Sequence, residues 1–286
     1  MTVTISAAPE KIVTINGESV NIWWGSSGDD SMVGGPGKDI MFGLGGDDTL
    51  HGDSIAATGA DNDILFGDWP DSPDQLTDAI RNLWGSDVTW AEVMGETWDQ
   101  SVARWVSHVA GADALYGDSR DGSGSGSGND ALFGGGGNDS LFGDSHSGDG
   151  SGNDLLYGGM GNDLLVGDTR QGNGSGHDKL DGNGGTDTLI GDVGGMGLID
   201  GTGHYVGSGW DMLDGGSGND VLYGDVHLPA GSTVTAGGAG NDVLCTTKPQ
   251  FLVVPRRFLR NSTHEFGIAT PGACEQGATL RIPCVA

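Results

Sequence analysis

The stretch GGMGNDLLVGD, residues 158–168, holds the pattern that decides the fold of this chain. Glycines precede Asp163, a short apolar run follows it, and the stretch ends at a second aspartate, Asp168. Glycine loses more conformational freedom on folding than any other residue, so such a segment needs a stabilising interaction beyond its own thin core. Because 57 of the 286 residues are glycine, most of the chain needs such an additional stabilising interaction.

The acidic composition limits the kinds of partner that the chain can bind. Its 40 acidic and 12 basic residues give a formal net charge of −28, which repels phosphate groups, excludes nucleic acid as a partner and favours cations. We expect no membrane span, because no run reaches the roughly 18 consecutive apolar residues of a transmembrane helix. The first residues lack a basic start before an apolar run, so we expect no cleaved signal peptide. All three cysteines lie after position 244, so disulfides do not hold the main body together.

The glycine-aspartate unit recurs fourteen times along the chain. The residue two positions after the aspartate is leucine in twelve units and methionine in two, and two-fold alternation points it inward from a short strand. A disordered glycine-rich linker has no reason to keep this register. The fourteen aspartates are Asp30, Asp39, Asp48, Asp63, Asp113, Asp130, Asp139, Asp154, Asp163, Asp178, Asp187, Asp211, Asp220 and Asp242.

These units resemble the haemolysin-type (RTX) calcium-binding nonapeptide repeat over roughly residues 25–244. Glycines permit tight turns in which carbonyl oxygens converge, and a carboxylate completes an all-oxygen site that suits a hard cation of calcium size. The predicted fold class is therefore all-β. The resemblance implies a right-handed parallel β-roll, a β-solenoid with several Ca2+ ions bound in its turns.

The spacing of the aspartates defines the size of one coil. From residue 130 to residue 187 the gaps alternate between 9 and 15, so each coil has 24 residues, a short turn and a long loop. In the resembling family each calcium lies between adjacent turns on one side. That implies one stack of Asp139, Asp163 and Asp187 and another of Asp130, Asp154 and Asp178. The aspartates that begin the later long loops are candidate additional ligands: Asp144, Asp168, Asp192 and Asp225.

Residues 69–110 interrupt the repeats of residues 25–68 and 111–244 with a predicted helical insertion. One helix is expected to begin at Ser72 as N-cap, with Pro73 in its first position and Gln75 closing a capping box, and to end at Gly85. A second helix is expected to begin after Thr97.

The helices of the insertion are rich in tryptophan: Trp84, Trp90, Trp98 and Trp105. Two interpretations remain open. These side chains form an exposed patch for a surface or host partner, or they pack the helices onto the roll. The second interpretation is favoured.

The two ends differ from the repeats. Residues 1–24 contain alternating and β-branched runs, which predict a β-rich cap for the first coil. Residues 245–286 contain five basic and two acidic residues and only three glycines. The change falls inside a repeat, which indicates a reading-frame shift, and an evolved terminal cap is the alternative.

No catalytic motif is found, so the chain is predicted not to be an enzyme. The sequence THEFG, residues 263–267, lacks the second histidine of a zinc protease motif, and no G-x-S-x-G elbow occurs. We expect a secreted calcium-binding protein that acts at the cell surface, in the matrix or in host contact. The alternative is a fragment or accessory module of a larger toxin or extracellular hydrolase. The family resemblance implies a type I export machinery and a Gram-negative source.

Overall fold

The computed structural model describes residues 3–5, 9–53, 61–105, 110–118, 128–145, 149–169, 172–192, 204–207, 211–218, 221–224, 235–238, 243–245, 266–269 and 280–282. At residues 3–5, 103–105, 204–207, 217–218 and from 235 onward, only the backbone is described.

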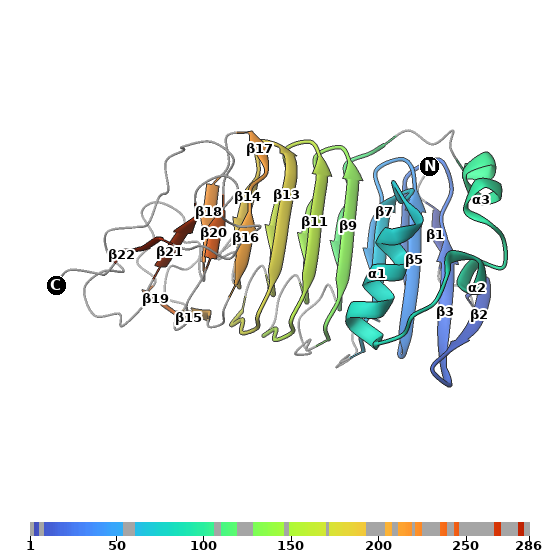
Figure 1. Ribbon diagram of the computed structural model, residues 1–286, viewed down its shortest axis with the longest axis horizontal. Helices are drawn as coiled ribbons and strands as arrows, with labels where there is room; N and C mark the ends of the chain where they lie inside the picture. Colours follow the sequence, from blue (N-terminus) through green and yellow to red (C-terminus); the bar gives the residue numbers. More distant parts are fainter. Residues whose placement is uncertain are drawn as a thin grey trace.

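Successive strands of the repeats alternate between two sheets, and the strands of each sheet lie side by side along the molecule (Figure 1). The eight-stranded sheet contains β1 (Val3–Ile5), β4 (Asp30–Val33), β6 (Thr49–His51), β8 (Ala114–Tyr116), β10 (Ser140–Phe142), β12 (Leu164–Val166), β14 (Thr188–Ile190) and β18 (Val221–Tyr223). The twelve-stranded sheet contains β2 (Lys11–Ile15), β3 (Glu18–Trp24), β5 (Lys38–Leu44), β7 (Ile64–Asp68), β9 (Ala131–Gly136), β11 (Leu155–Met160), β13 (Lys179–Gly185), β16 (Met212–Asp214), β17 (Ser217–Gly218), β20 (Val243–Cys245), β21 (Phe266–Ala269) and β22 (Leu280–Ile282). A separate pair is formed by β15 (His204–Gly207) and β19 (Thr235–Gly238).

The described strands pair in parallel, except β2 with β3 and β21 with β22, which pair antiparallel. Antiparallel neighbours are therefore confined to the first and last strands of the twelve-stranded sheet. Two parallel sheets that receive successive strands in turn, with few helices, are consistent with the β-roll that the sequence predicts.

The strand register confirms the 24-residue period in the middle of the chain. Leu156 of β11 pairs with Leu132 of β9 on one side and with Leu180 of β13 on the other. Leu65 of β7 also pairs with Leu132, although 67 positions separate the two residues. The intervening helices thus leave the strand stacking uninterrupted.

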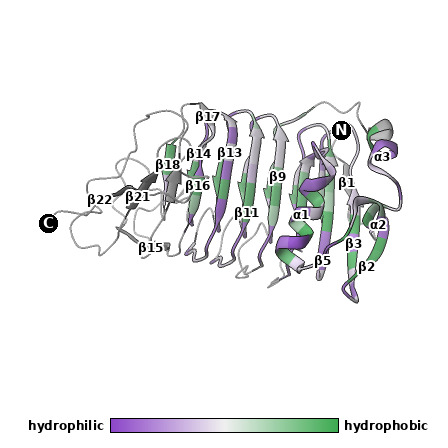
Figure 2. Ribbon diagram, in the orientation of Figure 1, coloured by the Kyte–Doolittle hydropathy of each residue, from purple (hydrophilic) through white to green (hydrophobic). Residues whose placement is uncertain are grey.

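The inward-facing positions form one continuous core between the sheets. Thirteen of the fourteen residues that lie two positions after a repeat aspartate belong to this cluster, together with Trp23, and all are at most 4% exposed. The fourteenth, Leu244, lies in β20, where only the backbone is described. Figure 2 shows hydrophobic residues within strands such as β5 and β9. The leucine prediction is confirmed at the described positions.

Replacing one inner leucine is expected to destabilise the calcium-loaded protein strongly. Leu156 is fully buried, and a buried Leu→Ala change costs about 2–5 kcal/mol because it removes apolar contacts and leaves a cavity. Denaturant melts should show a clearly smaller loss for Leu155→Ala, since Leu155 is only partly buried. Equal losses for the two variants would contradict the assignment of the inner face.

Along the chain, three helices follow β7 and precede β8: α1 (Pro73–Trp84), α2 (Trp90–Met94) and α3 (Trp98–Trp105) (Figure 1). The buried side chains of Leu76, Ile80 and Trp90 join Phe42 and Phe66 of the twelve-stranded sheet in a second apolar cluster.

Packing is the interpretation that the structure supports for the described tryptophans. Trp84 and Trp90 are at most 9% exposed, and Trp98 packs against the second cluster. The ring of Trp98 also stacks on Trp69, at a centroid distance of 5.7 Å. The side chain of Trp105 lies outside the described part of the chain.

The helix boundaries agree with the sequence, but one capping prediction is wrong. α1 has Ser72 as N-cap and ends at Gly85, which adopts a left-handed φ of 62°. The Ser72 side chain makes no capping hydrogen bond, and the Gln75 carbonyl accepts instead from the backbone of Asp71. A complete capping box occurs at the unpredicted helix α2, where Thr89 and Glu92 satisfy one another's backbone groups. The capping-box sequence therefore occurs at the start of both α1 and α2, but of these two helices only α2 forms both capping hydrogen bonds.

Candidate metal centre

The repeat aspartates form two rows that run from coil to coil. In each row, the backbone N–H of one aspartate donates to the Oδ1 of the next, at 2.6–3.0 Å. Row one contains Asp30, Asp48, Asp113, Asp139, Asp163 and Asp187. Row two contains Asp39, Asp63, Asp130, Asp154, Asp178 and Asp211. The two stacks expected from the family resemblance are therefore present as hydrogen-bonded rows.

These carboxylates are buried, and in at least eight of them one oxygen has no donor among the described residues. Every member of rows one and two is at most 3% exposed. Oδ1 accepts the backbone hydrogen bond, but among the described residues no group donates to Oδ2 of Asp48, Asp63, Asp113, Asp130, Asp139, Asp154, Asp163 or Asp178. Burying an unpaired carboxylate oxygen costs several kcal/mol, so each row needs protons or cations.

Glycines of the turns bring backbone carbonyls to the same unpaired oxygens. A Cβ atom on Gly143 would lie 2.2 Å from Oδ2 of Asp154 and 1.7 Å from the carbonyl oxygen of Gly167 in the next coil. Gly167 repeats this geometry with Asp178 and the carbonyl of Gly191. The glycines thus leave space in which a carboxylate oxygen and a carbonyl oxygen face one another, which is the donor set that calcium prefers.

A third row of aspartates begins the long loops. Backbone N–H groups of Asp118, Asp144 and Asp168 each donate to the carbonyl of the next member, ending at Asp192, at 3.0–3.2 Å. All four side chains are at most 1% exposed. Row three therefore lies inside the protein, although its members come from loops.

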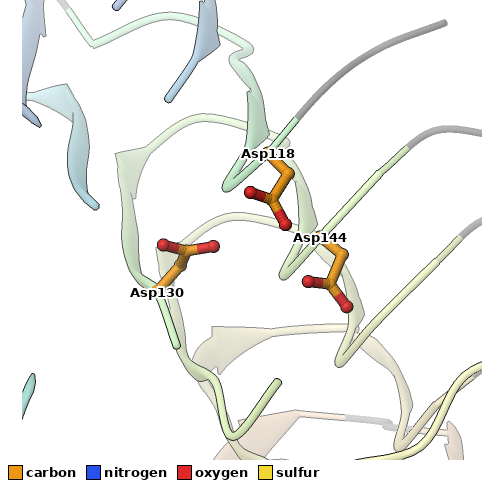
Figure 3. Close-up of side chains that lie close together, drawn as sticks. All are labelled: Asp118, Asp130 and Asp144. Carbon is orange, nitrogen blue, oxygen red and sulfur yellow. The ribbon is translucent and has the colours of Figure 1, made fainter. Parts of the chain in front are cut away.

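Rows two and three meet in groups of three carboxylates. In Figure 3, Asp118 and Asp144 lie on successive turns, and Asp130 points toward them from the facing strand segment. In this group, as in two further groups of row two and row three, one oxygen of each residue lies within 4.8 Å of the others. The three groups are Asp118, Asp130 and Asp144; Asp144, Asp154 and Asp168; and Asp168, Asp178 and Asp192.

The structure places the predicted site residues as follows. Every predicted aspartate in the described ranges lies in one of the three rows, and Asp220, Asp225 and Asp242 lie outside those ranges. Sequence reasoning missed Asp118 and the buried Asp53, which lies at the corresponding position after β6. The signal was present: both follow a strand in a Gly-Asp-Ser sequence, as Asp144 does.

Burial changes the acidity of these carboxyl groups. Loss of solvent raises the pKa of Asp48 and Asp139 to about 7 and that of Asp113 to about 8. Burial, followed by repulsion from Asp168, raises the pKa of Asp154 well above its ordinary value. In the absence of bound cations, the folded rows therefore take up protons more readily than the unfolded chain does.

Lower pH is expected to decrease the calcium concentration needed for folding. Because the folded-state pKa values are raised, protons stabilise the cation-free fold fully below about pH 4, and this stabilisation is lost as pH rises through about 7–8. The unfolded aspartates are already ionised at pH 6 and at pH 8, so folding with calcium releases no protons from them, whereas protons bound at pH 6 favour the cation-free fold. Circular dichroism titrations at pH 8 and pH 6 measure this shift, and equal midpoints would contradict it.

Rows of buried carboxylates with converging carbonyl oxygens define a repeat protein with oxygen-ligand sites for a hard cation. Residues 24–54, 125–146, 149–169, 174–195 and 205–226 match the family model of the RTX calcium-binding nonapeptide repeat (4 copies). The chain carries RTX calcium-binding nonapeptide repeats, as the sequence predicted. No curated protein and no solved structure matches the chain significantly. Among the described residues, no helix has the length and apolarity needed to cross a bilayer.

Proposed function

We propose that this chain is a secreted protein whose repeats fold into a right-handed parallel β-roll when they bind Ca2+. It acts at the cell surface, in the extracellular matrix or in host contact, as a binding protein and not as an enzyme. Calcium-binding repeats in the sequence and two parallel sheets with alternating strands support this proposal. Residues 25–68 and 111–244 form the roll in this proposal, residues 1–24 cap it and residues 69–110 cover one face. Residues 245–286 form an atypical tail, whose strands β21 and β22 extend the twelve-stranded sheet.

One observation carries the calcium assignment. The rows contain many buried aspartates whose second oxygen has no hydrogen-bond donor among the described residues. No lysine or arginine of the described ranges forms an ion pair with Asp130, Asp139, Asp154 or Asp163. Repulsion within the rows therefore opposes folding until cations bind, and the binding free energy then adds directly to stability.

A second candidate function is that of a repeat module of a larger toxin or extracellular hydrolase. It is favoured by the absence of catalytic motifs, since RTX repeats accompany catalytic or pore-forming domains in related proteins. A transcript that encodes such a domain in frame with these repeats would favour the module. Export by a type I machinery is part of both proposals, and accumulation of the chain in the medium of a cell that has such a machinery tests it.

Calcium, and not magnesium, is expected to fold the chain. Magnesium demands near-octahedral geometry and gives up water reluctantly, whereas these turns offer several carbonyl oxygens at adaptable spacing. Far-ultraviolet circular dichroism should show a coil-like spectrum with chelator, a β-rich spectrum with calcium and little change with magnesium at the same free concentration. A β-rich spectrum in chelator at pH 8 would contradict the proposal.

A further inference from the structure

Asp144 differs from the repeat aspartates because no backbone N–H of the described residues donates to its carboxylate. In rows one and two, Oδ1 is occupied by a backbone N–H of the neighbouring coil, which leaves a single oxygen for a cation. Among the described residues, both oxygens of Asp144 are without a donor, and the side chain is fully buried. Both carboxylate oxygens of Asp144 are therefore available to cations.

The position of Asp144 would let it bind two cations. It belongs to two neighbouring groups of three carboxylates, one with Asp118 and Asp130 and one with Asp154 and Asp168. Asp118 belongs only to the first of these groups. Each group collects three buried carboxylates, so its members repel one another when they are ionised unless a multivalent cation lies between them.

Glycines of two successive long loops lie close to the row-three carboxylates. A Cβ on Gly150 would lie 2.3 Å from Oδ2 of Asp144, and a Cβ on Gly174 would lie 2.5 Å from Oδ2 of Asp168. The backbone N–H of Gly152 donates to Oδ1 of Asp168 at 3.2 Å. The backbone of these loops thus approaches the buried carboxylates of Asp144 and Asp168 closely.

We propose that the side of rows two and three holds a series of cation sites, each formed by one row-two and two row-three aspartates, in which Asp144 bridges two neighbouring ions. This inference rests on the proposed calcium binding and adds a second class of site to it. In row one, by contrast, the described residues provide one aspartate per coil and no group of three. Each of the proposed ions is held by three carboxylates, which favours a doubly or triply charged hard cation.

Ion counts for two matched variants test the bridge. Asp144→Asn and Asp118→Asn remove one charge each from neighbouring positions of the same row. Equilibrium dialysis of the full chain in saturating calcium should show a loss of two bound ions for Asp144→Asn and of one for Asp118→Asn. Equal losses, or no loss for Asp144→Asn, would overturn the bridge. A wild-type chain that binds no calcium would instead contradict the proposed function.

A spectroscopic measurement on the wild-type chain covers the case in which Asp144→Asn does not fold. Manganese(II) accepts the same oxygen ligands, and two ions that share a carboxylate are spin-coupled. Electron paramagnetic resonance of the manganese-loaded chain should therefore contain a coupled component, which persists in the control variant Asp139→Asn of row one. A spectrum of isolated ions alone would overturn the proposal.

Discussion

Replacing Gly143 by alanine is expected to prevent the central coils from forming. The new Cβ would lie 1.7 Å from the carbonyl oxygen of Gly167 and 2.2 Å from Oδ2 of Asp154, and the first contact is with backbone that cannot rotate away. Overpacking in a core typically costs about 1–3 kcal/mol, and a clash with backbone should exceed that range. The expected result is a large loss of β structure at a calcium concentration that folds the wild type.

Gly28→Ala is the matched control for this experiment. Gly28 also lies in a repeat turn, but a Cβ there meets no atom within 4 Å. Neither glycine adopts a left-handed φ, so backbone strain does not distinguish them. The control should fold at nearly the wild-type calcium concentration. If Gly143→Ala folded equally well, the close approach of successive coils would be wrong.

Replacing an aspartate inside a row is expected to destabilise the protein more than replacing one at the end of the row. Asp163 accepts from the backbone of Asp139 and donates its own N–H to Asp187, both at 2.9 Å. Asp163→Ala therefore leaves the buried N–H of Asp139 without an acceptor, which costs about 1–3 kcal/mol. The substitution also removes a proposed cation ligand. Asp30 has a single neighbour in its row, Asp48, so Asp30→Ala should loosen one end of the stack.

The two variants are compared through their melting temperatures and calcium midpoints. The exposed Asp71 supplies the charge control, because Asp71→Ala removes one negative charge and touches no row. The expected order of destabilisation is Asp163→Ala, then Asp30→Ala, with Asp71→Ala close to the wild type. Equal effects of the first two substitutions would count against coupling between neighbouring coils.

The inner face of the fold and the two main rows could be predicted from the sequence because they follow strict periods. Leucine recurs at a fixed distance from aspartate, and the 24-residue spacing sets which coils become neighbours, as the pairing of Leu156 with Leu132 and Leu180 shows. Such regularity needs no knowledge of side-chain geometry. It therefore identified Asp139 and Asp154 as members of different stacks.

Features that depend on one local geometry could not be predicted in the same way. The Gly-Asp-Ser sequence of Asp118 lies outside the nonapeptide unit, so a search for that unit passes over it, although Asp118 and Asp144 lie in one row. In the sequence, the aromatic residues that follow the inner leucine or methionine cannot be told apart between the two sheets. Only the three-dimensional arrangement shows that Phe42 and Phe66 lie under the helices, whereas Phe142 belongs to the other sheet.

Hydrogen exchange resolved along the chain tests most directly whether cations bound in the aspartate rows hold the coils together. The backbone N–H groups of β9, β11 and β13 join neighbouring coils, so their exchange reports the roll itself. With calcium at pH 8, these strands should be strongly protected, and chelator should abolish the protection in all three together. Protection that persists in chelator would contradict the account.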